Sequence, residues 1–242
     1  MHEIDTNPLM MKNFPLIILI ILLSACSENT KKKAPKPLAT PKKVERKVVP
    51  KKQLLKTQPE VYLDDKNAIP FLFEYQQQNL PSKVKVSTRF GDFIIELYED
   101  APYHKANFIY LARLGYFDQT FFHRVVPEFI IQGGNSDHPN TAKKRRKIGR
   151  YLLPPDSNVK RKHHRGVVSI PSSEIDNPYK LASPYEFFIV QQSPGAYHLD
   201  GNYTPFGRVI EGMGVVDTIN AQPIDDREAP LRNVLMRIEV LE

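Results

Sequence analysis

The chain is poor in the residues that carry covalent and metal chemistry. It has 242 residues, no tryptophan and a single cysteine, Cys26. One thiol excludes disulfides within the chain and metal sites built from several cysteines. Long apolar runs are also missing, because the most apolar stretch, Phe14 to Leu23, is too short to span a bilayer as a helix. Because Cys26 is the only cysteine, we expect nothing in the folded part to depend on a redox state.

The run from Phe14 to Leu23 is instead typical of a signal peptide. Lys12 supplies a positive n-region, and small residues lead into Cys26. This arrangement resembles a bacterial lipobox, which implies cleavage before Cys26 and lipidation of its thiol and new amino group. The alternative is an uncleaved anchor that leaves a free thiol.

The first residues are unlike an n-region because they include Glu3 and Asp5. We expect translation to start at Met10 or Met11 and assign residues 1–25 to the signal peptide. The resemblance implies a protein of the cell envelope, anchored to a membrane by lipid, in the periplasm or on the outer face.

Residues 26–56 are predicted to be the lipidated cysteine and a basic tether. Lys31 to Lys56 contains ten lysines, Arg46, four prolines and one acid. Such a segment cannot bury enough apolar surface to offset its ordering entropy. It lies on anionic headgroups, at about 1 kcal/mol per well-placed lysine, or it is a solvated spacer.

The remaining sequence predicts a short helical extension, residues 57–82, followed by a mainly β domain. Asn67 to Asn79 is expected to be helical, with Asn67 as the cap and Pro81 after its end. Further on, the patterns predict many short strands and two helices, which favours a closed antiparallel barrel. The strands are Val84–Thr88, Phe93–Tyr98, Phe129–Gln132, Val167–Ile170, Phe187–Gln191, Phe206–Ile210 and Met236–Leu241, and the helices are Ala101–Leu114, ended by Gly115, and Gly214–Asn220.

The run from Phe121 to Gly134 holds the most specific signal. It places Arg124 among apolar side chains, with the amide of Gln132 eight residues later. An arginine donates fixed hydrogen bonds but is no general base at neutral pH. It suits chemistry in which a neutral group is polarised in a dry pocket. The alternative is a core strand with an incidental surface arginine.

This run closely resembles the active-site signature of the cyclophilins, the cyclophilin-type peptidyl-prolyl cis-trans isomerases. The resemblance covers residues 83–242 and implies a closed eight-stranded antiparallel barrel with a helix capping each end. It also implies isomerisation of X-Pro bonds in exported or envelope proteins. That reaction breaks no bond, so we expect no cofactor and no metal. The expected partners are proline-containing polypeptides and the membrane, without nucleic acid, and the expected state is a monomer.

The resemblance also implies the site residues. Arg124 would stabilise the twisted amide, and Gln132 would orient the arginine and the substrate backbone. The hydrophobic seat for proline would consist of Phe129, Ile130, Phe188 and Leu199.

Two further side chains are ambiguous. Tyr203 matches the loop where its hydroxyl would bind the substrate carbonyl, or its ring only packs. His123 should point away from Arg124 because strand side chains alternate, so a structural hydrogen-bonding role is expected.

Three departures from the family pattern bear on activity. Glu186 stands where the family has a substrate-contacting glutamine, and near Arg124 it would pair with the guanidinium. Pro171 removes a backbone donor. His198 stands where many relatives have tryptophan, which predicts weak binding of cyclosporin-type inhibitors.

The segment from Lys143 to Arg165 carries ten basic residues against Asp156. It is expected to steer acidic polypeptides or anionic lipid, or to be a solvated loop. His163 and His164 lack further ligands at metal spacing, so no metal is assigned.

Two alternatives to an enzyme are kept open. One is a weakly active or inactive binding module, or chaperone, for proline-containing segments, which Glu186 and Pro171 would favour. The other is an envelope adaptor that works through the basic segment.

Overall fold

The computed structural model describes residues 61–156, 160–172 and 176–242. The predicted signal peptide, Cys26 and the tether lie outside these residues. Across the described part of the chain, no helix is both long and apolar enough to cross a membrane.

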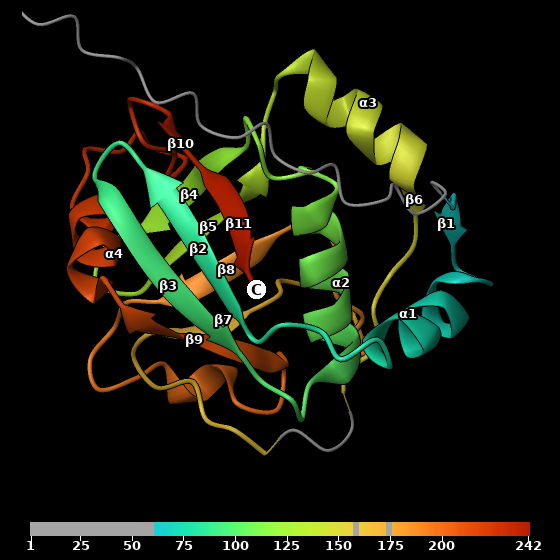
Figure 1. Cartoon of the computed structure of the whole chain (residues 1–242). Coiled ribbons are helices and arrows are strands. Elements are labelled where there is room, and N and C mark those ends of the chain that lie inside the picture. The colour runs from blue at the N-terminus through green and yellow to red at the C-terminus, as the bar shows by residue number, and fades with distance from the viewer. Residues whose placement is uncertain (1–60, 157–159, 173–175) are drawn as a thin grey trace, which may run out of the picture. The chain divides into compact units, whose positions relative to one another are not determined.

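The domain is a nearly closed antiparallel barrel (Figure 1). Its strands follow the order β10-β4-β5-β8-β7-β9-β3-β2-β11. Their bounds are β2 Lys83–Thr88, β3 Gly91–Leu97, β4 Phe121–Val126, β5 Ile130–Asn135, β7 Val167–Ser169, β8 Phe187–Val190, β9 Pro205–Glu211, β10 Val234–Leu235 and β11 Arg237–Leu241.

The sheet has nine strands where eight were expected, because its last strand is divided. Only Met236 separates β10, which pairs with β4, from β11, which pairs with β2. The Met236 backbone N–H donates to the carbonyl of Thr120 at 2.9 Å, which extends the β10–β4 register by one residue before the chain moves to β2. One C-terminal segment therefore bridges the two edges of the sheet, which protects both from unpaired exposure.

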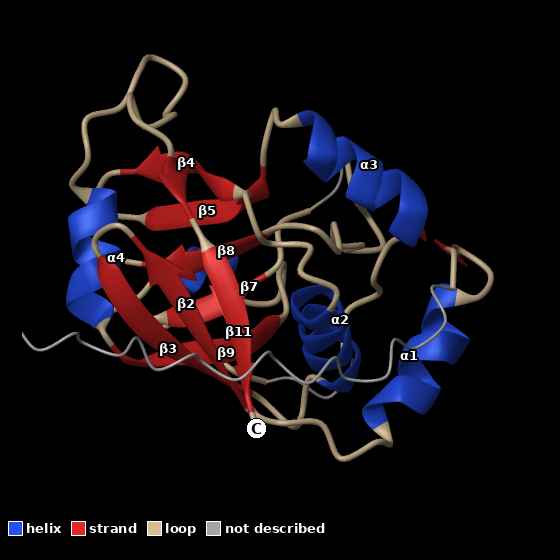
Figure 2. Cartoon of the chain, turned by 45° about the horizontal axis from the view of Figure 1, so that its top comes forward, coloured by secondary structure: helices blue, strands red, loops and turns tan. Residues whose placement is uncertain are grey.

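The two helices predicted within the domain lie at opposite ends of the barrel (Figures 1 and 2). They are α2 (Pro102–Arg113) and α4 (Met213–Asn220). Gly115 adopts φ +64° just past α2, as its C′ position requires. The start of α2 is capped from a distance, because the Asp156 carboxylate accepts the backbone N–H groups of Tyr103 and His104, each at 3.2 Å.

The extension is helical but shorter than predicted, since α1 spans Ala68–Gln76. Asn67 sits at the N-cap position, yet its side chain makes no capping bond. Its Oδ1 accepts from the backbone N–H of Asp64, and its Nδ2 donates to the carbonyl of Tyr62. Asn67 therefore closes the preceding turn. Helix α1 packs outside α2 (Figure 2) through the rings of Phe71, Tyr75 and Tyr110.

A third helix was not predicted. α3 spans Pro139–Ile148 and contains five of the ten basic residues of the basic segment, for which a solvated loop was one of the two interpretations. Lys144 explains its placement, since Nζ donates to the carbonyls of Gly115, Tyr116 and Asp118 just past the end of α2. After α3, the short strand β6 (Gly149–Arg150) pairs in parallel with β1 (Leu63–Asp64).

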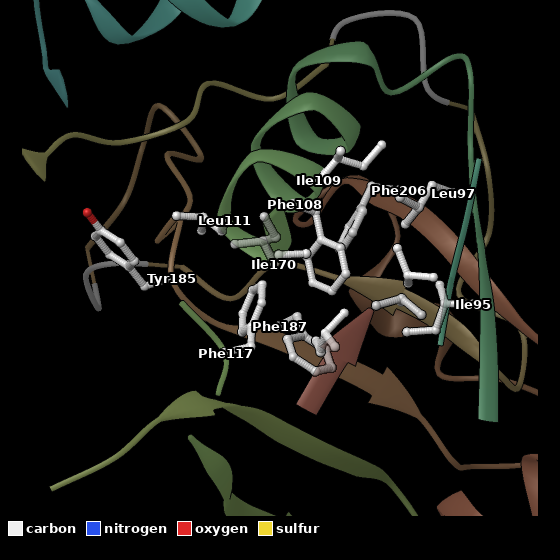
Figure 3. Packing of buried hydrophobic residues seen from close by; sticks show 14 of the residues in the cluster. Ile95, Leu97, Phe108, Ile109, Leu111, Phe117, Ile170, Tyr185, Phe187 and Phe206 are labelled. Carbon is white, nitrogen blue, oxygen red and sulfur yellow. The ribbon is translucent and has the colours of Figure 1, made fainter. Parts of the chain in front are cut away.

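The main core lies inside the barrel and under α2. Phe108 of α2 meets Phe187 edge-on with ring centroids 5.4 Å apart, and its centroid lies 5.3 Å from that of Phe206 (Figure 3). All three side chains are fully buried. Burial of a phenylalanine contributes about 1.5–3 kcal/mol. This packing fixes one face of β8, so its opposite face is presented outward.

Candidate active site

Two rows of side chains cross the outer face of β4, β5 and β8. The register places Arg124 opposite Gln132, and Gln132 opposite Phe188. Two residues along, Val126, Ile130 and Val190 form the second row. Residues directly opposite one another in a sheet share a face, as do residues two apart. A polar donor pair therefore lies beside an apolar strip.

Arg124 is held by a carboxylate that the sequence reasoning missed. Its Nε donates to Oε2 of Glu228 at 2.6 Å. The two side chains are 39% and 40% exposed. Glu186 was the carboxylate expected near Arg124. The structure corrects that assignment, since Glu186 has other partners.

The loop before β10 is built to present Glu228. The Asp225 carboxylate accepts the backbone N–H groups of Arg227 and Ala229, which closes the loop. Glu228 adopts φ +64°, and its carbonyl accepts the N–H of Val125 at 2.7 Å. A non-glycine residue in this conformation is strained unless its surroundings hold it. The backbone next to Arg124 therefore holds Glu228 in place.

Glu186 instead binds the catalytic candidate Gln132. Its Oε2 accepts from Nε2 of Gln132 at 2.9 Å, and its Oε1 accepts from Nδ2 of Asn135 at 3.1 Å. Arg145 of α3 lies 3.8 Å away. Burial alone would raise the pKa of Glu186, but the contacts of His123, Gln132 and Arg145 outweigh it and lower that pKa. Glu186 is thus a stable anion behind Gln132.

A β-bulge changes the position of His123. The register shifts between Phe122 and Arg124, which leaves His123 as an extra residue in β4. Its Nε2 comes within 3.5 Å of the Glu186 oxygen that also binds Gln132. Simple alternation therefore predicted its direction wrongly. The contact with Glu186 is consistent with the structural role expected of it.

The expected hydrophobic seat comes together as one cluster, separate from the main core. Its buried members are Ile130, Phe188, Val190 and Ala196, and Val126, Phe129, Leu199 and Tyr203 pack against them. We call these eight residues the apolar cluster. Its members come from β4, β5 and the turn between them, from β8 and from the loop from 196 to 203, so only the folded chain assembles them.

The loop residues shape this cluster from one side. Tyr203 meets Phe188 edge-on with ring centroids 5.4 Å apart, and its hydroxyl has no partner among the described residues. Ring packing is thus present, and the hydroxyl stays available to a ligand. His198 stacks on Phe129 with ring centroids 5.2 Å apart. The imidazole therefore covers one face of the Phe129 ring.

His163 packs against the Phe188 ring of the apolar cluster. It is fully buried, and its ring bridges Asp200 at 2.8 Å and the Ser169 hydroxyl at 3.0 Å. Burial lowers the pKa of His163, although the Asp200 carboxylate opposes that shift. The ring stacks on Phe188 with centroids 6.3 Å apart. His163 thus links the 196–203 loop to β7. Among the described residues, no group of three potential ligands could hold a metal ion.

Asn220 of α4 fixes the turn that presents Phe129. Its Nδ2 donates to the carbonyls of Val126 and Ile130, and its Oδ1 accepts the N–H of Glu128. Glu128 adopts φ +57° in this turn. The sequence gave no signal for this contact, because 90 residues separate Asn220 from Ile130.

Pro171 lies two residues before the undescribed residues 173–175. It lacks a backbone N–H, and its carbonyl already accepts the N–H of Ser183 at 3.0 Å. Pro171 therefore offers a peptide no backbone donor, whereas its carbonyl oxygen keeps a second lone pair.

Comparison with known proteins agrees with this geometry. The family model for cyclophilin type peptidyl-prolyl cis-trans isomerases matches residues 83–240. This chain belongs to the cyclophilin-type peptidyl-prolyl cis-trans isomerase family. The match includes every residue of the two rows and of the apolar cluster.

Curated peptidyl-prolyl cis-trans isomerases from eukaryotes are about one-third identical to the chain over the aligned residues. It is 32% identical over 165 residues to the Arabidopsis thaliana peptidyl-prolyl cis-trans isomerase CYP18-2, covering 67% of this chain and 95% of that one. It is 33% identical over 167 residues to the isomerase-like 2 protein of Rhizopus delemar, covering 68% of this chain but only 30% of that longer relative.

Solved cyclophilins share the fold. A Cryptosporidium parvum cyclophilin type isomerase superposes with a TM-score of 0.56 at 27% identity, covering 67% of this chain and 98% of that one. A second structure of the same protein, determined in the presence of the dipeptide Ala-Pro, gives a TM-score of 0.55.

Proposed function

We propose that this cyclophilin accelerates cis-trans isomerisation of X-Pro bonds in exported or envelope polypeptides. The observation that carries the proposal is the placement of Arg124 and Gln132 beside the apolar cluster on one outward face. An amide resists rotation because its C–N bond has partial double-bond character, with a barrier of about 18–20 kcal/mol. A catalyst must therefore favour the twisted amide over the planar one.

Arg124 supplies a donor for the twisted state. Rotation makes the prolyl nitrogen pyramidal and restores its lone pair, which a guanidinium N–H can then bind. Glu228 occupies Nε of Arg124, so the terminal nitrogens are the ones directed at substrate. A preorganised donor of this kind contributes on the order of 3–4 kcal/mol.

The remaining residues hold the substrate. The proline ring sits against Phe129, Ile130, Phe188 and Leu199, where water is excluded from the carbonyl. Gln132 orients the peptide backbone, and the Tyr203 hydroxyl donates to the substrate carbonyl. Glu186 keeps Gln132 in one orientation through the 2.9 Å hydrogen bond.

The test is exchange NMR on a short neutral X-Pro peptide with the full chain. Arg124→Ala should reduce exchange at least 100-fold, whereas Arg237→Ala, a matched exposed arginine on β11, should leave it unchanged. Peptide shifts with no exchange in the wild type would contradict the enzymatic function.

That result would favour the second candidate, a binding module for proline-containing segments. One observation supports it: Gln132 is hydrogen-bonded to Glu186, so part of its donor capacity is already used. In that case Arg124→Ala would weaken peptide affinity modestly, with no turnover to lose.

We further propose that lipidation of Cys26 anchors the protein in the cell envelope and that residues 26–56 are the tether. The lipobox-like sequence before Cys26 and the basic composition of the tether support this. Cys26→Ser should release the protein from the membrane fraction. A wild type that fractionates without membranes would contradict the anchor.

A further inference from the structure

The second half of the basic segment lines a hollow that the isomerase site does not use. The hollow encloses about 510 Å³. Its lining comes from the residue after β3, the first residue of β7, the middle of β9 and residues 160–165. We call it the basic hollow, and it is lined by Tyr98, Lys160, Arg161, Lys162, His164, Arg165, Val167, Arg208 and Val209.

The three arginines of the basic hollow are fixed by carboxylates. Arg161 donates through Nε to Asp100 at 3.0 Å and lies 3.8 Å over the Tyr98 ring. Arg165 donates to Asp217 at 2.6 Å and Arg208 to Glu96 at 2.9 Å. These pairs give the walls a defined shape.

The two lysines carry the charge that is not neutralised. Lys160 and Lys162 are exposed and have no ion pair within 4.0 Å among the described residues. Asp200 offsets part of the charge of Lys162, but it hydrogen-bonds His163. Five cations face the three paired carboxylates and Asp200, so a net positive charge remains and the basic hollow attracts an anionic group.

The basic hollow shares a wall with the apolar cluster. His163 points inward and stacks on Phe188, while the neighbouring Lys162 and His164 line the hollow. His164 is hydrogen-bonded to the Tyr197 hydroxyl at 2.9 Å. Tyr197 begins the short helix Tyr197–Leu199, whose last residue belongs to the apolar cluster. The basic hollow and the apolar cluster therefore adjoin each other along residues 162–164 and 197–199.

We propose that the basic hollow binds an acidic stretch of the polypeptide whose X-Pro bond lies at the isomerase site. This inference rests on the proposed function and adds a substrate class to it. A polypeptide is favoured over a free anion because the hollow adjoins the wall of the apolar cluster. The hollow thus selects clients in which acidic residues flank the proline.

The experiment compares three peptides that share one X-Pro core. One is neutral, one carries glutamates before the proline, and one carries them after it. Each acidic peptide has a glutamine analogue as its reference. Affinity is measured by titration at low salt with the full-length wild type, K160E/K162E and K143E/R146E. The last variant makes the same change in charge at exposed positions of α3, away from the hollow.

We expect one of the two acidic peptides to bind the wild type about fivefold to tenfold more tightly than its glutamine analogue. That preference should disappear in K160E/K162E and persist in K143E/R146E. No preference for either acidic peptide would overturn the proposal. So would an equal loss in both variants, because general charge attraction would then explain the preference.

Two further probes separate other sources of negative charge. If inorganic phosphate or anionic phospholipid vesicles bind through Lys160 and Lys162 while the acidic peptides show no preference, the hollow is a phosphate site and the proposal fails. The neutral peptide reports on the isomerase site separately, since its exchange rate should be the same in all three proteins. If the wild type does not accelerate exchange of the neutral peptide, the proposed function is refuted, but the preference for acidic peptides is not.

Discussion

Replacing Glu228 by glutamine should slow isomerisation without unfolding the protein. The Glu228 carboxylate accepts from Nε of Arg124 at 2.6 Å. A hydrogen bond to a charged group contributes about 1.5–3 kcal/mol, but these side chains are 39% and 40% exposed. Solvent screening reduces the contribution to about 1 kcal/mol. If that energy orients Arg124 in the transition state, kcat/KM falls about fivefold.

The assay separates orientation from binding and from folding. Glu228→Gln should lower kcat while KM changes little, because the aligned guanidinium matters most in the twisted state. In the background of Arg124→Ala, the same substitution should have no further effect. Glu239→Gln, which removes another exposed ion pair at 3.4 Å from Lys85, should leave kcat unchanged. An unchanged rate in Glu228→Gln would refute the reasoning, because Glu228 would then not orient Arg124. A faster rate would also refute it, because Glu228 would then restrain Arg124.

Two other predictions concern stability. The pKa of Glu186 is lowered in the folded state. Its contribution to the free energy of unfolding is therefore present above its ordinary pKa of 4.5 and is lost as the pH falls through its pKa in the folded protein. Glu186→Gln should lower the free energy of unfolding by about 1–3 kcal/mol at neutral pH. In urea denaturation at a series of pH values, the difference from wild type should shrink below pH 4.5. A difference that does not depend on pH would contradict this prediction. Gly149 adopts φ +139°, and a Cβ there would lie 1.8 Å from the Leu63 carbonyl oxygen. Gly149→Ala should therefore break the pairing of β1 with β6 and destabilise the domain by about 2–4 kcal/mol. It should also make the extension more susceptible to protease. Unchanged urea unfolding and unchanged proteolysis would count against the close contact.

Local sequence was sufficient for most of the barrel. Alternating apolar residues located the strands, and Pro102 and Gly115 marked the ends of α2, because these signals act through neighbouring residues. The run around Arg124 identified the family for the same reason, since its residues lie together in the chain. Five of the eight members of the apolar cluster were predicted, and only through the family resemblance, because the cluster draws on distant segments.

The partners of the site residues depended on the tertiary fold. Glu228 follows Arg124 by 104 residues, and no local pattern connects them. The bulge at His123 and the placement of Glu186 behind Gln132 arise from the pairing of β4, β5 and β8. The basic segment showed its charge in the sequence, but the fold divided it between α3 and the basic hollow. Composition thus reveals which charges a chain carries, whereas packing decides which of them are neutralised and which remain available to a partner.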